Sequence, residues 1–216
     1  MKIIRSKRKT IALVIEQDGS LTVRAPQRFS RANIDQLVLE KAGWIRERQA
    51  WVRQHSTAPH RYEEGELFYY LGITYPLSYV DRQKQPLLLI DTFQLHRPSK
   101  TQAKKVFTSW YRDQARQIIG ERASILANHH HLVFKDLHIT SARTRWGSCS
   151  SSGALNFTWR LVMAPLEVID YVIIHELAHL KIHNHSSEFW NYVEQLSPNY
   201  RTLRKWLEDN GGRFNL

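Results

Sequence analysis

The stretch Val172-Ile173-Ile174-His175-Glu176-Leu177-Ala178-His179-Leu180 contains the motif His-Glu-x-x-His inside an apolar run. Because His175 and His179 are four residues apart, a helix would place both on one face, one turn apart. Two neutral imidazoles in this arrangement can share a zinc ion, and Glu176 can reach a zinc-bound water without being a ligand. Zinc lowers the pKa of such a water to roughly 7, and a nearby carboxylate can take its proton. The motif therefore predicts a metal-dependent hydrolase.

The residues around the motif predict a buried helix. Pro165 suits the first turn of a helix, and Glu167 favours the positive end of the helix dipole. The apolar residues that then recur at helical spacing are Leu166, Ile169, Val172, Ile173, Leu177 and Leu180. His and Glu side chains inside such an apolar helix need partners. The alternative is a core helix with two hydrogen-bonded histidines and no metal, which we favour less because His and Glu are rarely fully buried alone.

A zinc site of the catalytic kind needs a third protein ligand and an open fourth position. The candidates that follow the motif are His183, His185, Glu188 and Glu194. If the helix continued, His183 would share a face with His179 but would lie about 12 Å along the axis from His175. Ligands in a straight row cannot surround one ion, so we expect the chain to turn back before the third ligand.

We expect this turn directly before His185. Asn184 tolerates the left-handed conformation that ends many helices, and Ser186 is a typical cap for a next helix over residues 187–196. His185 also has the spacing of the third ligand in the longer signature His-Glu-x-x-His-x-x-Gly-x-x-His, although Ile182 replaces its glycine and the sequence shows no obvious Met-turn. We therefore predict His185 as the third metal ligand, with Glu194 as the fallback.

The rest of the chain predicts an α+β fold in two parts. Residues 1–97 are expected to form a small, antiparallel β-rich module with one long helix from Ser30 or Asn33 to about Gln54. Its strands are expected within 2–25, around a turn at Asp18-Gly19, and over 67–71, 73–80, 87–90 and 92–96.

Residues 98–216 are expected to form a zincin-like helical half with a short sheet and an active-site helix. A long helix is expected over about 100–129, and a last helix is expected to end near Asn210. Strands over 137–140 and 155–159 are expected to form the sheet with a hairpin that lies over the metal helix. A free edge of that hairpin could hold an extended peptide.

The composition limits the classes of protein to consider. The 216 residues include 31 Lys and Arg against 20 Asp and Glu, a formal net charge of +11. The charge is scattered apart from the run Arg5 to Lys9, and it suits either an anionic partner such as nucleic acid or simply a well-dispersed basic protein. A single cysteine, Cys149, excludes an intrachain disulfide. Neither a signal peptide nor the ~20 apolar residues of a membrane span is found, so we expect a cytoplasmic protein with no membrane partner.

Further motifs are spread along the chain. They are Arg145-Trp146-Gly147-Ser148-Cys149, Trp159-Arg160-Leu161, Pro165, Val168-Ile169-Asp170-Tyr171-Val172, Asn184-His185-Ser186 and Phe189-Trp190, with Ser6-Lys7-Arg8-Lys9-Thr10 and Asp18-Gly19-Ser20 near the start. Together with the His-Glu-x-x-His run, they resemble the YgjP-like metallopeptidase family, which is related to the SprT-like and WLM zinc peptidases. The resemblance covers nearly the whole chain and implies Zn2+ at the positions of His175, His179 and His185, with Glu176 as the general base. Phe157-Thr158 departs from the family, which more often has an aliphatic residue and Asn there.

Three functions remain open at this point. The first is a zinc metallopeptidase that acts on peptides or proteins. The second is a nucleoside triphosphate (UTP-type) pyrophosphatase, because some YgjP-like members are associated with pyrophosphohydrolysis of pyrimidine triphosphates and the positive charge would suit that substrate. The third is a nucleic-acid-associated module with structural zinc, which is disfavoured because structural zinc sites usually have four protein ligands. Arg145, His183 and Tyr200 are conceivable transition-state stabilisers that the sequence does not rank.

Overall fold

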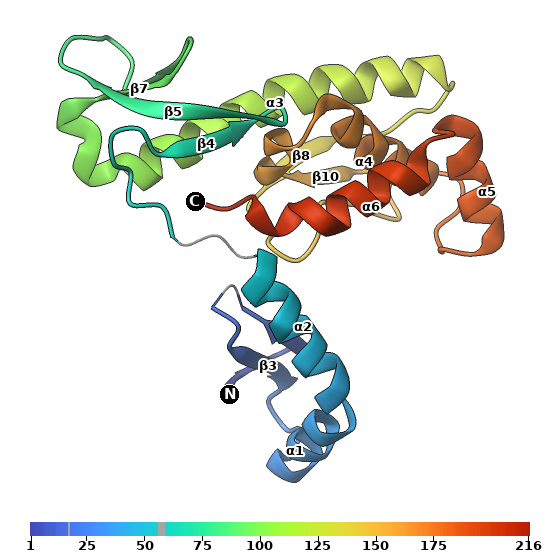
Figure 1. The fold of residues 1–216 in the computed structure, drawn as a ribbon. Coiled ribbons are helices and arrows are strands. Elements are labelled where there is room, and N and C mark those ends of the chain that lie inside the picture. The colour runs from blue at the N-terminus through green and yellow to red at the C-terminus, as the bar shows by residue number, and fades with distance from the viewer. Residues whose placement is uncertain (17, 56–58) are drawn as a thin grey trace. The chain divides into compact units, whose positions relative to one another are not determined.

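The structure is a computed structural model that describes residues 1–16, 18–55 and 59–216 (Figure 1). Its fold is α+β, as the sequence predicts, and the chain divides into two compact units, Met1–Ala58 and Pro59–Leu216. Each unit has a hydrophobic core of its own. Among the helices that the structure describes, none combines the length and the apolarity needed to cross a bilayer.

The described residues of the N-terminal unit form a three-stranded sheet and two helices. Its elements are β1 (Lys2–Ser6), β2 (Ala12–Ile15), β3 (Leu21–Pro26), α1 (Arg31–Glu40) and α2 (Ala42–His55). The strands lie in the order β1-β3-β2, with β2 and β3 antiparallel around the predicted turn at Asp18-Gly19. However, β1 pairs with β3 in parallel, so this sheet is mixed rather than antiparallel. Alternate side chains of β3 enter the core, as expected for a strand with one covered face.

The single helix expected up to about Gln54 is instead two helices, α1 and α2. Lys41 ends α1, and its backbone N–H bonds to the carbonyl oxygens of Leu37 and Leu39. A straight helix would separate Ile34 from Ile45 by about 16 Å along its axis. Both side chains are buried in one small core, so the chain has to bend between them.

The strands that follow belong to the second unit. They are β4 (Leu67–Tyr70), β5 (Ile73–Val80), β6 (Leu87–Leu89) and β7 (Phe93–His96), which form a sheet in the order β4-β5-β7-β6. Phe68 of β4 and Phe93 of β7 pack on Phe107 of α3 (Ala103–His129), with ring centroids 4.3 and 5.2 Å from the Phe107 ring. This aromatic packing joins the sheet to α3, so the division between the units falls at 58/59 and not at the expected 97/98.

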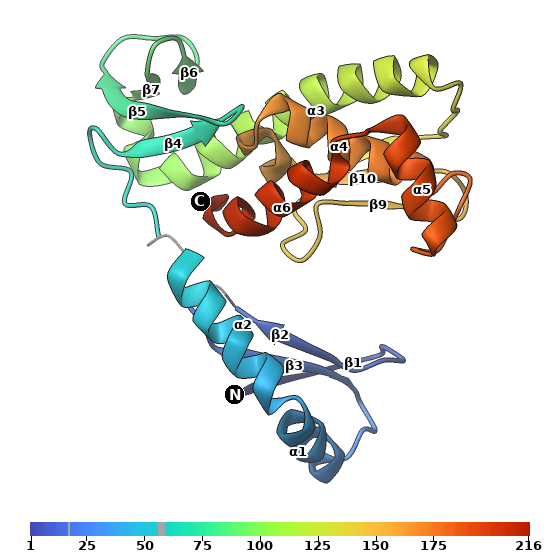
Figure 2. The ribbon, with the colours of Figure 1, turned by 45° about the vertical axis from the view of Figure 1, so that its right-hand side comes forward.

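The second unit contains another sheet, which lies beside the helix that carries the motif (Figures 1 and 2). Its strands β8 (Leu137–Thr140), β9 (Gly147–Cys149) and β10 (Leu155–Thr158) lie in the order β8-β10-β9, with β10 parallel to β8 and antiparallel to β9. A 3₁₀ segment, Trp159–Met163, leads to α4 (Leu166–Ala178), α5 (Ser187–Leu196) and α6 (Tyr200–Asn210), close to their predicted bounds. Arg122 of α3 and Asp170 of α4 join the two helices through hydrogen bonds of 2.7 and 2.5 Å.

The tip of the β4–β5 hairpin is fixed against the segment that leads into α4. The backbone N–H groups of Leu71 and Gly72 donate to the carbonyl oxygens of Val162 and Met163, at 2.9 and 3.1 Å. Gly72 has a φ of +82°, in the left-handed region, and a Cβ there would lie 2.7 Å from Cγ of Pro165. Glycine therefore lets the hairpin reach the start of the motif helix.

We expect Gly72→Ala to destabilise the protein more than Gly65→Ala does. Both glycines have left-handed φ angles, +82° and +81°, so either alanine costs about 1–2 kcal/mol of conformational strain. At Gly65 the new Cβ meets nothing within 4 Å, whereas at Gly72 it overlaps with Pro165 and adds roughly 1–3 kcal/mol. Urea unfolding followed by circular dichroism would measure both free energies of unfolding, and equal losses would contradict the close packing on Pro165.

Candidate metal centre

Helix α4 carries the motif through the core of the second unit. Ile169, Ile173 and Leu177 are fully buried, and Glu176 and His179 retain only 5% and 9% of their accessible surface. The prediction of a buried helix around the motif is confirmed. The helix ends at Ala178, so His179 is its C-cap residue and not part of a continuing helix.

The chain turns back between His179 and Ser186, as predicted, although the local geometry differs from the prediction. Asn184 does not adopt the left-handed conformation. Its side-chain oxygen instead accepts a hydrogen bond from the Ser186 N–H at 3.1 Å, a local turn that Asn side chains favour. Ser186 caps α5 as predicted, because its hydroxyl accepts from the Phe189 N–H at 3.4 Å. His185 lies directly between this turn and this cap.

The turn brings the side chains of His175, His179 and His185 together. One ring nitrogen from each histidine lies within 4.8 Å of the other two. Nε2 of His175 and Nε2 of His185 are 3.1 Å apart, and the three ring centroids are 4.7 to 5.1 Å from one another. Within the described parts of the chain, no carboxylate or thiol joins this group.

Neighbouring groups fix the orientation of the rings. The backbone carbonyl of Ile182 can only accept a hydrogen bond, so Nδ1 of His179 donates to it at 2.9 Å and leaves the Nε2 lone pair free. Phe189 of α5 stacks on the His179 ring at 4.4 Å. The same phenyl ring contacts His175 and His185, at centroid distances of 5.0 and 4.9 Å. Helix α5 thus supports all three imidazoles through one buried side chain.

Burial keeps the imidazoles of α4 neutral. It lowers the pKa of His175 to about 3, and His179, His185 and Arg204 act in the same direction. Burial also lowers the pKa of His179, against the effect of its bond to the Ile182 carbonyl. Neutral imidazole is the form of histidine that binds a metal ion.

Glu176 is held against strand β9. Burial raises the pKa of its carboxyl group to about 8, opposed by a hydrogen bond from the Cys149 backbone and by the charge of Arg145. A Cβ at Gly147 would lie 2.6 Å from Cγ and 2.7 Å from Oε1 of Glu176, so glycine is what allows the strand this close. Sequence spacing does not predict the contact, because β9 and α4 are far apart in the chain, although Gly147 lies in the Arg-Trp-Gly-Ser-Cys run noted above.

The other candidate ligands lie outside the histidine cluster. Glu194 pairs with Arg201 of α6 at 3.4 Å. Glu188 is exposed in the first turn of α5, and His183 is exposed in the turn before it. The structure therefore brings His175, His179 and His185 together and leaves Glu194 outside this cluster.

The conceivable transition-state stabilisers Arg145 and Tyr200 differ in how near they lie to the motif. Arg145 is near enough to Glu176 to lower the pKa of its carboxyl group. Tyr200 stacks on Trp190 with ring centroids 5.5 Å apart, and Trp190 lies 5.6 Å from the His175 ring. Tyr200 is thus separated from the cluster by an indole ring, whereas Arg145 acts directly on the motif.

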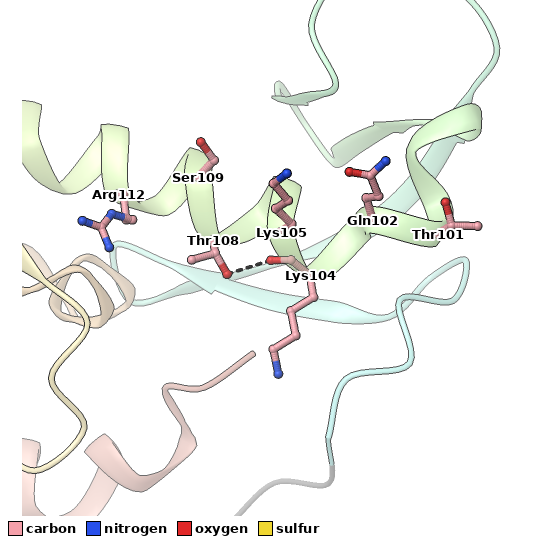
Figure 3. Close-up of a pocket in the computed structure, with 7 residues that line it drawn as sticks. All are labelled: Thr101, Gln102, Lys104, Lys105, Thr108, Ser109 and Arg112. Atoms are coloured by element: carbon pink, nitrogen blue, oxygen red, sulfur yellow. Dashed lines mark hydrogen bonds between the residues drawn. The ribbon is translucent and has the colours of Figure 1, made fainter.

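Of two surface hollows in the second unit, one adjoins this site. One, of 440 Å³, is lined by residues of β8, β9, β10 and the loop before β9, and it includes Gly147. It therefore adjoins the strand that contacts Glu176. The other, of 640 Å³, lies over the start of α3 with Lys104, Lys105 and Arg112 (Figure 3). Lys104 and Lys105 point to different sides of the helix, and the lining contains no His, Cys, Asp or Glu, so this larger hollow is not a candidate for metal chemistry.

The chemistry of the histidine cluster fits a zinc ion. Imidazole nitrogen is a common zinc ligand, and two nitrogens bound to one tetrahedral ion are about 3.3 Å apart. The 3.1 Å between the Nε2 atoms of His175 and His185 is close to that separation. Three protein ligands also leave open the fourth position that a catalytic zinc site needs.

Comparison with known proteins gives a family match over most of the chain. The family model described as "YgjP-like, metallopeptidase domain" matches residues 9–210. No curated protein gives a significant match. Among solved structures, the metallopeptidase zymogen abylysin of Pyrococcus abyssi is 20% identical, with a TM-score of 0.39, over 45% of this chain and 99% of that one. That structural likeness is slight, so the family match is the finding that bears on function.

We expect His185→Ala to weaken zinc binding by more than about 100-fold, because loss of a supporting hydrogen bond alone costs up to that much at other sites. Glu194→Ala should leave zinc affinity unchanged, because this carboxylate pairs with Arg201. Competition with a chromogenic chelator would measure both affinities. Zinc loss in Glu194→Ala with full retention in His185→Ala would reverse the assignment of the third ligand.

Proposed function

The chain belongs to the YgjP-like metallopeptidase family, and we propose that it hydrolyses peptide bonds with a zinc ion held by His175, His179 and His185. Glu176 acts as the general base in this proposal. The observation that carries it is that one ring nitrogen from each of the three histidines lies within 4.8 Å of the other two, beside a helix that also buries a carboxylate. A structural zinc site would usually supply a fourth protein ligand, and the described residues offer none at this cluster.

Glu176, Gly147 and His179 would each contribute to this reaction in a different way. When bound, zinc would supply a Lewis acid that polarises the peptide carbonyl and lowers the pKa of water. Glu176 would accept a proton from the attacking water at a carboxylate oxygen and deliver it to the leaving amine. Gly147 limits the positions open to that carboxylate, since the strand lies directly against Oε1. The hydrogen bond from His179 to the Ile182 carbonyl keeps its Nε2 lone pair directed away from the backbone.

Strand β9 offers a docking edge for an extended substrate. It is the last strand in the order β8-β10-β9, so one of its edges has no strand partner within the described residues. An extended peptide can add to such an edge through main-chain hydrogen bonds. Because the same strand contacts Glu176 at Gly147, a peptide paired there would lie near the general base. This edge supports a peptide or protein substrate.

We expect Glu176→Gln to lower kcat/KM for cleavage of an unfolded protein by about 10²- to 10⁴-fold, the usual contribution of a general base. Zinc should be retained, because the three imidazoles are untouched. Glu167→Gln is the matched control, since it makes the same change at an exposed position in the first turn of the same helix. Its rate should equal that of the wild type, and a chelator should abolish cleavage in both.

The same proteins should also be assayed for pyrophosphate release from nucleoside triphosphates. Release that depends on Glu176, in the absence of any peptide cleavage, would replace the peptidase proposal with the pyrophosphatase alternative. Undiminished cleavage by Glu176→Gln would contradict the assignment of the general base.

We expect Gly147→Ala to reduce cleavage by about 100-fold, the cost of a displacement of about 1 Å at a reacting group. The added methyl group would overlap with Glu176 and leave the histidines in place, so zinc binding should persist. Gly120→Ala, where a Cβ meets nothing within 4 Å, controls for the substitution itself. A wild-type rate for Gly147→Ala, measured with the same substrate, would contradict this prediction. It would show that strand β9 shifts to accept the methyl group while the Glu176 carboxylate stays in place.

A further inference from the structure

The positive charge of the chain is concentrated in the N-terminal unit. Residues 1–58 contain 12 of the 31 Lys and Arg residues but only 5 of the 20 Asp and Glu residues. This unit therefore carries +7 of the net +11 on little more than a quarter of the chain. The run Arg5 to Lys9 is the densest part of this charge but not all of it.

The fold brings two basic segments to one end of the sheet. Because β1 is parallel to β3 and β2 is antiparallel to it, the end of β1, the start of β2 and the end of β3 coincide. The loop after β1 and the segment between β3 and α1 both leave from this end (Figure 2). We call it the basic end, and it consists of Arg5, Lys7, Arg8, Lys9, Arg24 and Arg28.

Arg5 ties the two segments together. Its Nη1 donates to the backbone carbonyl oxygens of Pro26, Gln27 and Phe29, at 3.2, 3.0 and 2.6 Å. The loop after β1 is thereby held beside the segment that leads into α1. The positions of the charges are thus set by the fold, which reduces the ordering cost of binding a ligand.

Acidic groups do not offset the charge at this end. Residues 5–10 and 24–30 contain no Asp or Glu. Glu16 and Asp18 lie in the β2–β3 turn at the opposite end of the sheet, and Asp35 pairs with Arg31 at 3.0 Å. The first turn of α1 contains no acidic residue either, so its positive helix end adds to the potential.

We propose that the basic end of the N-terminal unit binds the phosphate backbone of nucleic acid. Lys7, Lys9 and Arg28 are exposed on two adjoining segments, and a spread of cations of this kind matches a row of phosphates rather than one small anion. Like charges gathered in this way repel one another unless an anionic partner is bound. None of these three side chains packs in the hydrophobic core of the unit.

A membrane surface fits this end less well than nucleic acid does. Interfacial binding needs apolar side chains that enter the lipid. Within residues 5–10 and 24–30, Ala25 is fully buried and Phe29 packs on the core of the unit. These segments also present no free aromatic ring on which a base could stack, so the recognition is of phosphates and does not depend on base sequence.

The test compares two variants of the full chain that remove equal charge. The basic-end variant carries Lys7→Gln, Lys9→Gln and Arg28→Gln, and the control carries Lys41→Gln, Arg46→Gln and Arg53→Gln. All six side chains are exposed and lie in the same unit. Fluorescence anisotropy would follow binding to labelled double-stranded DNA, single-stranded DNA and single-stranded RNA of about 20 nucleotides, between about 50 and 200 mM salt. Thermal melts would show that both variants remain folded.

We expect wild type to bind at least one of these nucleic acids, and the basic-end variant to bind it at least about 10-fold more weakly. The slope of log affinity against log salt should fall by about 2–3 in that variant, since each phosphate contact contributes roughly 0.7–0.9, whereas the control should stay near wild type. Equal weakening in the two variants would overturn the proposal, as would a lack of binding at about 50 mM salt. Binding to anionic phospholipid vesicles but to no nucleic acid would also overturn it. None of these outcomes depends on the zinc site.

Discussion

Helix α4 carries two imidazoles and a carboxylate into the hydrophobic core, and each of these groups would be costly to leave without a partner there. Burial is the largest of the causes that lower the pKa of His175 and raise that of Glu176, so it disfavours the charged form of both side chains. The features around it can be understood as responses to that cost. The Ile182 carbonyl bonds to His179, and the Cys149 backbone bonds to Glu176. The ring of Phe189, from a third segment, contacts both histidines of the motif.

Much of this centre could be predicted because it depends on local rules. The apolar period of α4, the Ser186 cap and the position of His185 just before it follow from residues that are neighbours in the chain. Asn184 was predicted correctly as a turn residue but with the wrong conformation, because its side chain forms the turn through the Ser186 N–H instead of through a left-handed backbone.

The features that escaped prediction depend on contacts between distant segments. Nothing near Gly147 indicates that its missing side chain makes room for Glu176. The break at Lys41 follows from the small size of a core that must receive both Ile34 and Ile45. Likewise, the strands from β4 to β7 join the second unit because Phe107 of a later helix packs against them. The sheet between residues 67 and 96 therefore belongs to the same unit as the motif helix. The tip of its hairpin, at Gly72, contacts Pro165, the residue directly before that helix.

His175 and His179 are positioned by a helix that the whole core holds, whereas His185 lies in the short segment between that helix and α5 and contacts Phe189 of α5. The number of residues in this segment therefore sets where the third imidazole lies. Insertion of one residue between His179 and Ser186 would leave both helices and their packing possible, but it would shift the third imidazole relative to the other two. Length variation at this connection is thus a means by which a chain of this fold could separate the third imidazole from the other two while it keeps its stability.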